Sequence, residues 1–317
     1  MRTSYRTVGI KEKSMKINSG KALKADFMLL VVAVCWGFSY YGMKIALEEV
    51  TTFTLNTYRF LGAFTVAVIL SFPKLRGVNR TMLMYSGAIG VVLAAVYAGA
   101  TIGVQYTTLS NCAFLCATTV FFVPVLEFIL YRKKTSKKIF FAITICFIGI
   151  MLMTLKEDFS FNLKHLKGDL ISLSTGVTYA LEIVITSKAV SDKRVDPYIT
   201  GVFSLASCGI VMLILSIAVE NMTVPDSANV WIAVIFLAVF CTGVAFIIQP
   251  IAQQHTEPSH VGIIFSLEPV FAGIIAFLFA GEVLTQKQVF GEVLILIALF
   301  FMEVDFGKMK KSRKPKP

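Results

Sequence analysis

Long apolar stretches separated by short polar segments are the feature that most restricts how this chain can fold. Of its 317 residues, 56% are hydrophobic and only 15% are charged, whereas about 25% of the residues of a soluble domain are charged. A helix that crosses a membrane needs about 20 mostly apolar residues. The expected helices are 27–47, 52–72, 83–104, 110–131, 138–155, 169–188, 198–219, 230–252, 260–280 and 288–305. The sequence therefore predicts an all-α integral membrane protein with ten transmembrane helices.

The basic residues lie almost entirely on one side of this predicted topology. If the N-terminus is cytoplasmic, the inner segments hold 24 of the 30 Lys and Arg residues, and the outer connections hold only 4. This bias marks the cytoplasmic side of a multi-pass protein, so the net charge of +11 indicates membrane orientation and not a nucleic-acid partner. We predict cytosolic basic tails at 1–25 and 306–317, with the first retained and not cleaved as a signal peptide. The predicted location is the plasma (cell inner) membrane.

The two halves of the chain resemble each other. Residues 105–153 overlay 254–302 without a gap after a shift of 149 positions, and their hydropathy stays in register. Because five helices are an odd number, the second half must start on the side where the first half ends. Two inverted five-helix repeats are typical of transporters, which expose one central site to each side in turn. The predicted repeats are 26–156 and 167–305.

Ionisable residues inside the predicted helices are the first candidates for function, because a charge at the centre of a membrane helix costs about 2.5–3.5 kcal/mol. Glu268 is the deepest of them. Pro269 follows it and cannot donate a hydrogen bond to the carbonyl of Phe265, so we expect an opened helical turn beside this carboxyl group. Glu268 could gate or couple transport, or it could be a hydrogen-bonded residue that fixes a kink.

Further polar and aromatic residues could line a central cavity. Glu182 lies one turn from Tyr179, and this pair could bind an ammonium or a sugar hydroxyl; the alternative is a pairing with a neighbouring helix. Arg59 could gate transport or bind an anion, although we prefer a structural pair with Glu48, Glu49 or a helix end. Glu127 is expected to pair with Arg132 and Lys133. The predicted substrate-binding residues are Trp36, Tyr40, Tyr97, Tyr179, Glu182 and Gln249, and the predicted gating or coupling residues are Glu268 and Arg59.

The sequence contains no catalytic or metal-binding motif. The three histidines, His165, His255 and His260, do not have the spacing of metal ligands. Six cysteines lie in apolar stretches, where thiols act as small hydrophobic groups. We expect no metal and no cofactor. A membrane-embedded, lipid-modifying enzyme is the rival class, and it would need charged clusters near one membrane face.

Three stretches resemble the drug/metabolite transporter superfamily, and in particular its EamA-like family. They are Trp36-Gly37 with Ser39 and Lys44, then Tyr58-Arg59-Phe60-Leu61, and then Ser266-Leu267-Glu268-Pro269-Val270-Phe271 with Gly281-Glu282. The resemblance implies ten helices, two EamA repeats, cytosolic ends and a central cavity. The first half departs from the pattern, because Thr119-Val120 stands in place of Glu268-Pro269 and Arg132-Lys133 in place of the Gly-Glu pair.

The preferred hypothesis is a secondary transporter that is not an enzyme. The resemblance implies small polar metabolites, amino acids or their analogues above all, exported by alternating access across the plasma membrane. A carrier of sugar- or nucleotide-type metabolites is an alternative, although their phosphates favour Arg and Lys, which are scarce inside the helices. The expected partners are a small-molecule substrate and the lipid bilayer, and the chain could be a monomer or a homodimer.

Overall fold

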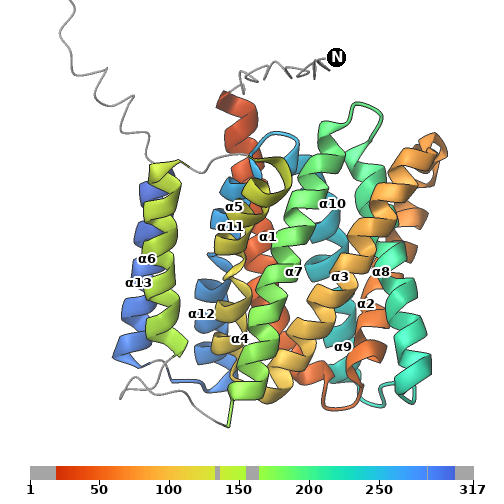
Figure 1. The fold of residues 1–317 in the computed structure, drawn as a ribbon. Coiled ribbons are helices and arrows are strands. Elements are labelled where there is room, and N and C mark those ends of the chain that lie inside the picture. Colours follow the sequence, from red (N-terminus) through yellow and green to blue (C-terminus); the bar gives the residue numbers. More distant parts are fainter. Residues whose placement is uncertain (1–18, 133–135, 155–163, 284, 304–317) are drawn as a thin grey trace, which may run out of the picture.

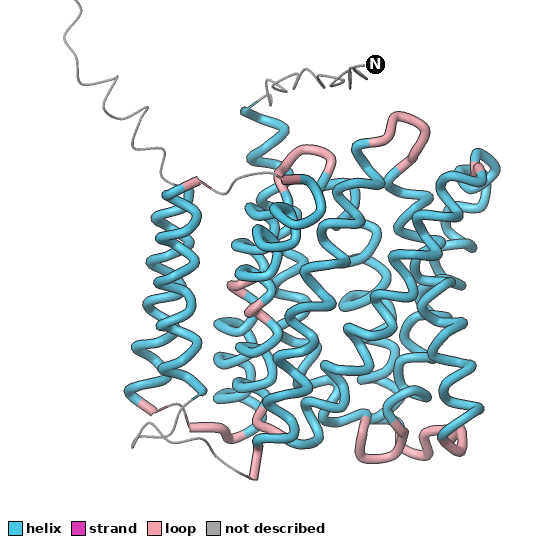
Figure 2. Tube along the Cα trace, in the orientation of Figure 1, coloured by secondary structure: helices cyan, strands magenta, loops and turns pink. Residues whose placement is uncertain are grey.

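The computed structural model describes residues 19–132, 136–154, 164–283 and 285–303, and within these ranges the chain is helical with no strand. Short loops connect the helices wherever the connection lies within these ranges (Figures 1 and 2). The elements are α1 Ser19–Ala46, α2 Thr52–Ser71, η1 Phe72–Gly77, α3 Arg80–Tyr106, α4 Leu109–Cys116, α5 Thr119–Tyr131, α6 Lys137–Thr154, α7 Leu166–Ser191, α8 Pro197–Val219, α9 Ala228–Phe236, η2 Leu237–Val244, α10 Ala245–Gln253, α11 Pro258–Phe265, α12 Glu268–Ala280 and α13 Gln286–Glu303.

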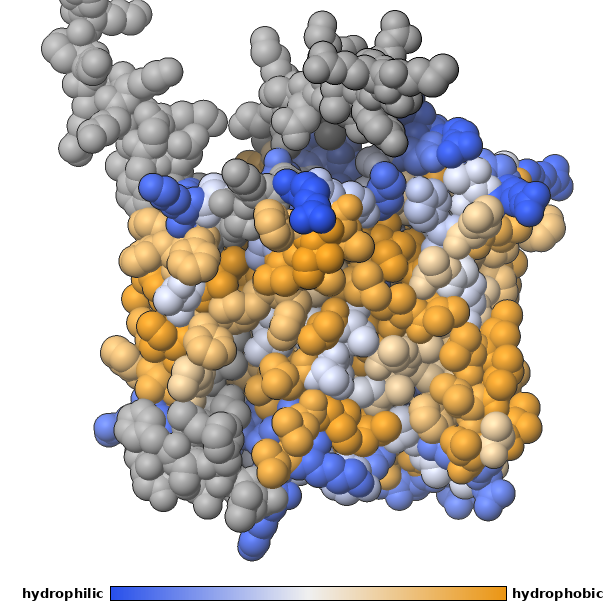
Figure 3. Space-filling view, viewed as in Figure 1, coloured by the Kyte–Doolittle hydropathy of each residue, from blue (hydrophilic) through white to orange (hydrophobic). Residues whose placement is uncertain are grey.

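These elements form ten membrane-length segments. In the described part of the chain, eight helical stretches are long and apolar enough to cross a membrane. The other two segments, α6 and α13, have 18 residues each, which corresponds to about 27 Å of helix. An apolar band covers the middle of the visible face, with polar residues gathered above and below it (Figure 3). The expected fold, ten transmembrane helices in two inverted repeats, is confirmed.

The repeat appears directly in the bounds of the helices. Adding 149 to the bounds of α4 (109–116), α5 (119–131) and α6 (137–154) gives those of α11 (258–265), α12 (268–280) and α13 (286–303). In Figure 1, α4 lies below α5, whereas α11 lies above α12, so the two broken helices run in opposite directions. We call the end of the molecule where α1 begins the upper face, and the opposite end the lower face.

Each half packs its first helix against the broken helix of the other half. α1 packs against α11 and α12, and α7 packs against α4 and α5. Glycines permit this close approach, because a Cβ atom on Gly37 of α1 would overlap Phe271, and one on Gly176 of α7 would overlap Thr118. The halves are therefore interlocked around both helix breaks. α3 packs equally closely on α7, where Cβ atoms at Gly99 and Gly103 would overlap side chains of α7.

Both broken helices are interrupted near their middle. The stretch 260–280 is interrupted at 266–267, beside Pro269 as expected. The stretch 110–131, expected as one helix, is also interrupted, at 117–118, although it has no proline there. At each break a hydroxyl bonds a carbonyl three residues back, a bond that competes with the helical backbone. These bonds are Thr118 Oγ1 to the Leu115 carbonyl at 2.6 Å and Ser266 Oγ to the Ile263 carbonyl at 2.7 Å.

The expected helix 230–252 also departs from a simple α-helix. Its middle third, η2, is a π-helix between α9 and α10. A π-helix shifts the hydrogen-bond register of the backbone, and such segments are frequent at functional sites. Here the Cys241 carbonyl accepts a hydrogen bond from Trp36 Nε1 at 2.9 Å, and Thr242 Oγ1 accepts one from Arg59 Nε at 3.2 Å. The irregular segment therefore positions two residues of the candidate site.

Candidate functional site

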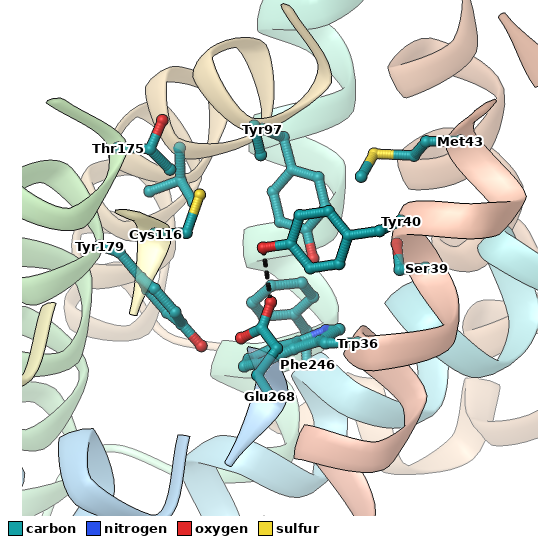
Figure 4. Close-up of a pocket in the computed structure, with 12 residues that line it drawn as sticks. Trp36, Ser39, Tyr40, Met43, Tyr97, Cys116, Thr175, Tyr179, Phe246 and Glu268 are labelled. Carbon is teal, nitrogen blue, oxygen red and sulfur yellow. Dashed lines mark hydrogen bonds between the residues drawn. The ribbon is translucent and has the colours of Figure 1, made fainter. Parts of the chain in front are cut away.

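A small cavity of about 40 Å³ lies between the helix breaks at the centre of the molecule. All of its lining residues are buried. A cavity needs about 10–15 Å³ to hold one water molecule, so this one has room for a few water molecules and not for a metabolite. It is lined by Trp36, Ser39, Tyr40 and Met43 of α1, Val96, Tyr97 and Ala100 of α3, Cys116 of α4, Thr175 and Tyr179 of α7, Phe246 of α10 and Glu268 of α12 (Figure 4).

Glu268 supplies the carboxyl group of the cavity wall. It is the first residue of α12, so it lies at a helix N-terminus, where the backbone dipole favours negative charge. The Tyr40 hydroxyl donates a hydrogen bond of 2.8 Å to Glu268 Oε1. The Tyr179 hydroxyl points toward the same carboxyl group (Figure 4) and has no hydrogen-bond partner. Two phenols and a carboxyl group thus converge on the cavity, with unused bonding capacity.

Arg59 supplies a buried cation directly behind the opposite wall. Its side chain is fully buried, its guanidinium carbon lies 4.7 Å from the centre of the Tyr97 ring, and Nη2 donates to Ser39 Oγ at 3.1 Å. Nη1 has no hydrogen-bond partner. Within the described ranges no carboxylate forms an ion pair with Arg59. The guanidinium therefore rests on two residues that line the cavity, with one nitrogen unused.

The expected pairing of Arg59 with Glu48 or Glu49 is wrong. Glu49 instead accepts hydrogen bonds from the backbone N–H groups of Asp226 (2.7 Å) and Ser227 (3.0 Å), ahead of α9. The hydrogen bonds from Ser227, and then that from the Asp226 backbone, lower the pKa of the Glu49 carboxyl group. A helix N-terminus has unpaired N–H groups that attract a carboxylate. Glu49 is therefore bound at the lower face and does not reach Arg59.

Aromatic rings form most of the remaining wall. Trp36 contacts Phe265 with ring centres 4.8 Å apart, Phe246 at 5.3 Å and Tyr179 at 5.6 Å. The Tyr97 ring meets Phe246 at 5.6 Å. Edge-to-face aromatic contacts of this kind are rigid and present both ring faces and polar tips. The cavity can therefore contact an apolar group along its walls while its few polar groups orient a ligand.

The cavity is closed toward the upper face by contacts between the two halves, which we call the upper clasp. Glu127 of α5 accepts a hydrogen bond of 2.5 Å from Ser259 of α11, and Asp26 of α1 contacts His260 of α11 at 3.1 Å. The predicted pairing of Glu127 with Arg132 and Lys133 stays a prediction, because Lys133 lies outside the described residues. The upper clasp thus joins the first half to the start of α11.

An equivalent set of contacts, the lower clasp, closes the opposite face. Glu282, which follows the left-handed Gly281, accepts hydrogen bonds from the backbone of Leu109 (2.9 Å) and the hydroxyl of Ser110 (2.7 Å) at the start of α4. Asp169 of α7 accepts one from Thr107 at 2.7 Å. Ser110 and Ser259 occupy equivalent positions of the repeat, and each bonds a carboxylate of the other half. The clasps are therefore related by the internal symmetry, and both are closed.

Comparison with known proteins shows which family has this architecture. The profile of the EamA-like transporter family matches residues 23–155 and again 166–304. The chain belongs to the EamA-like transporter family. It is 28% identical to an uncharacterized transporter of Archaeoglobus fulgidus, over 90% of this chain and 87% of the relative. It is 25% identical to the uncharacterized inner membrane transporter YedA of Escherichia coli, over 90% and 92% of the two chains. A solved crystal structure shares the fold with a TM-score of 0.69, at 14% identity over 92% of this chain and 99% of the other.

The structure of this EamA-like transporter places the predicted site residues other than Arg59 in two groups. Trp36, Tyr40, Tyr97, Tyr179 and Glu268 line the cavity. Glu182 and Gln249 lie outside its lining and bind each other, with Gln249 Nε2 donating to Glu182 Oε2 at 2.8 Å. Their assignment to substrate binding stays a prediction.

Sequence reasoning missed several lining residues. Ser39 and Met43 could have been found, since they lie on the α1 face that carries Trp36 and Tyr40. Val96, Ala100, Cys116, Thr175 and Phe246 carry no signal that separates them from ordinary packing residues. Among the described residues, no group of three His, Cys, Asp or Glu side chains could hold a metal ion.

Proposed function

We propose that this EamA-like transporter carries amino acids or closely related zwitterions across the plasma membrane by alternating access. The observation that carries the proposal is the closed central cavity, in which a carboxyl group and aromatic walls lie in front of a buried, unpaired guanidinium. The uncharacterized relatives are named as transporters, which supports the class and leaves the cargo to be argued from the site.

Alternating access is supported by the two clasps. The cavity of about 40 Å³ is too small for a metabolite, so one side must open before a substrate enters. Release of the upper clasp would separate α11 from α1 and α5, and release of the lower clasp would separate α4 from α7 and the end of α12. Because the clasps are equivalent under the inverted repeat, one closed state can open in either direction.

A zwitterionic substrate is supported by the buried carboxyl group of Glu268 and the buried guanidinium group of Arg59. A buried ion without a partner is costly, because no counter-charge replaces the lost hydration. An α-ammonium group could contact Glu268 together with the Tyr40 and Tyr179 hydroxyls, while an α-carboxylate could contact Arg59 and Ser39. Such a ligand compensates both charges at once, whereas a purely anionic or cationic ligand compensates only one.

The proposed direction is export, with the upper face in the cytoplasm. The described basic residues Lys74, Arg76, Arg80, Lys193 and Arg194 belong to upper-face connections, in agreement with the positive-inside rule. Export follows from the resemblance of the chain to its family and not from the geometry. Gating or coupling by Glu268 and Arg59 remains part of the proposal.

The test compares amino acids in the spent medium of cells that express the wild type, Glu268→Gln or Glu292→Gln at matched protein levels. Glu292 is a suitable control, because it is a buried carboxyl residue of α13 that does not line the cavity. One or two amino acids should accumulate with the wild type and Glu292→Gln, and not with Glu268→Gln. No accumulation in any of the three cultures would contradict amino-acid export, and equal accumulation in all three would contradict the role of Glu268. A chemically altered product would favour the membrane-enzyme class.

A further inference from the structure

A second polar cluster lies outside the cavity, between α7 and α10. Glu182 is almost completely buried, and its two carboxyl oxygens accept hydrogen bonds from Thr186 Oγ1 at 2.7 Å and from Gln249 Nε2 at 2.8 Å. The other amide atom of Gln249 has no partner, and neither amide atom of Gln253 has one. Buried polar groups are almost always hydrogen-bonded, so three orphan atoms on Gln249, which binds Glu182, and on Gln253, one turn further along α10, require an explanation.

No charge compensates Glu182 in the described part of the chain. The helices that pack against α7 are α3, α4, α5, α10 and α11. The charged groups there bond elsewhere, with Glu127 of α5 on Ser259 and His260 of α11 on Asp26. α10 carries no charged residue. The other charged groups are Arg80 at the upper end of α3, Lys167 and Asp169 at the lower end of α7, and Lys188 of α7, which lies over the Tyr131 ring. The remaining titratable groups are the hydroxyls of Tyr85, Tyr97, Tyr106, Tyr131 and Tyr179 and the thiols of Cys112 and Cys116.

The cluster can satisfy Glu182 in both of its protonation states. A deprotonated carboxylate accepts from the Thr186 hydroxyl and from the Gln249 amide, as observed. A protonated carboxyl group needs one acceptor, and the Gln249 amide provides it when its oxygen and nitrogen exchange places. An amide partner can therefore follow the proton, which an Arg or Lys partner could not do.

Polar residues continue from Glu182 toward the upper face and toward the cavity. Gln253 lies one turn above Gln249 and is the last residue of α10, followed by the half-buried Gln254. In the other direction, Tyr179 lies one turn below Glu182 on α7, and its unpartnered hydroxyl points toward Glu268 (Figure 4). Buried carboxyl groups linked by polar side chains are the usual parts of proton relays in membrane transporters.

We infer that Glu182 binds and releases a proton during the transport cycle, through Gln249 and Gln253 toward the upper face, at a site separate from the substrate cavity. This inference rests on the proposed transport function. Of the two roles proposed for Glu268, it leaves gating to Glu268 and assigns proton coupling to Glu182, because a proton and a substrate ammonium group would compete for the same oxygens in the cavity wall.

The test uses the full chain in liposomes that contain a pH-sensitive dye, with the amino acid identified in the spent medium as the substrate. Wild type, Glu182→Gln and Glu292→Gln are compared in two assays: uptake driven by an imposed pH gradient, and exchange of labelled for unlabelled amino acid at equal pH. Glu182→Gln should keep the exchange and lose both the response to the pH gradient and the proton movement. Glu292→Gln should behave as wild type. A pH response in Glu182→Gln equal to that of the wild type would overturn the inference.

A second variant keeps the inference testable if Glu182→Gln does not fold. Gln253→Leu leaves Glu182 and its partners in place and removes the polar step to the upper face, so it should slow proton movement while exchange continues. Unchanged proton movement would overturn the pathway. Infrared spectroscopy gives a measurement without transport, because the wild type should show a protonated carboxyl band that changes with pH. One component of that band should be lost in Glu182→Gln and retained in Glu292→Gln, while the contribution of Glu268 remains in both. A band in Glu182→Gln identical to that of the wild type, or a wild type with no such band, would overturn the inference even if no amino acid is transported.

Discussion

The two broken helices share their backbone and differ in their chemistry. α4–α5 and α11–α12 are interrupted at equivalent positions, and a hydroxyl hydrogen bond accompanies each interruption. The second half places Glu268 at its break, in the cavity wall. The first half places Thr119 there, fully buried, outside the cavity lining and with an unpartnered hydroxyl. The repeat therefore preserves the break in both halves, while only the break of the second half contributes a carboxyl group to the cavity.

The largest expected difference between the halves is in substrate binding. A hydrogen bond to a charged group contributes about 1.5–3 kcal/mol, and 1.4 kcal/mol corresponds to a tenfold change in affinity. Glu268→Gln should therefore weaken amino-acid binding by about 10- to 100-fold. The equivalent change Thr119→Val removes a hydroxyl that has no partner, so binding should change by less than about threefold. Ligand-induced thermal stabilisation of the purified protein measures both effects, and equal effects would mean that the halves share the site.

Weakening the two clasps should open the cavity toward opposite faces of the molecule. Glu282→Gln weakens the lower clasp and Glu127→Gln the upper one, and a loss of about 1.4 kcal/mol shifts the open population roughly tenfold. Cys116 is a native reporter, because it lines the cavity and is buried in the closed state. A membrane-impermeant thiol reagent should modify Cys116 faster from the lower side in Glu282→Gln and faster from the upper side in Glu127→Gln.

Removal of the Cys116 thiol provides the control for the labelling experiment. Cys116→Ala in each background should abolish the side-specific labelling, which assigns the signal to the cavity and not to Cys112. Accelerated labelling from the same side in both variants would show that the contacts do not act as opposed gates. The two clasps would then be structural contacts whose symmetry follows from the repeat alone.

The fold was largely predictable, because the length and apolar composition of each stretch and the 149-residue shift between the halves can be read directly from the sequence. Glu268 was found for the same reason, since a carboxyl group followed by proline is visible locally. The pairing of Arg59 was not, because its partners Thr242 and Ser39 are neutral and come from other helices, and the carboxylate of Glu49 is already bound by the N–H groups ahead of α9.

Two backbone features were missed because their signals are weak. The break in α4–α5 contains Thr118, and a threonine inside an apolar stretch is usually compatible with a continuous helix. The π-helix η2 has no composition of its own, and Leu237–Val244 reads as ordinary membrane helix. Separation of Glu182 from the cavity likewise depends on the packing of α7 against α10, which no single stretch encodes.

A smaller expected effect tests whether the breaks are equivalent. Proline inside a helix costs about 3 kcal/mol or more. Val120 occupies the position of Pro269, and its N–H makes only a bond of 3.2 Å to the Ala117 carbonyl within the break. Val120→Pro should therefore cost about 1 kcal/mol, whereas Val184→Pro in the uninterrupted α7 should cost the full amount. Thermal unfolding in detergent compares them, and equal losses would mean that the first break is an ordinary helical turn.

The smallest expected effect concerns the turns that end the two broken helices. Gly281 ends α12 with φ 68°, and Arg132 ends α5 at the equivalent position with φ 55°. A left-handed conformation costs roughly 1 kcal/mol for a residue with a Cβ atom, so Gly281→Ala should destabilise the protein by about that amount. Arg132→Gly removes the same strain but gives the unfolded chain about 0.4–1 kcal/mol more conformational freedom, so the two terms should nearly cancel. Because the turn at Gly281 directs Glu282 to α4, Gly281→Ala should also accelerate Cys116 labelling from the lower side, and Arg132→Gly should not. A change in stability without a change in labelling would separate the turn from the lower clasp.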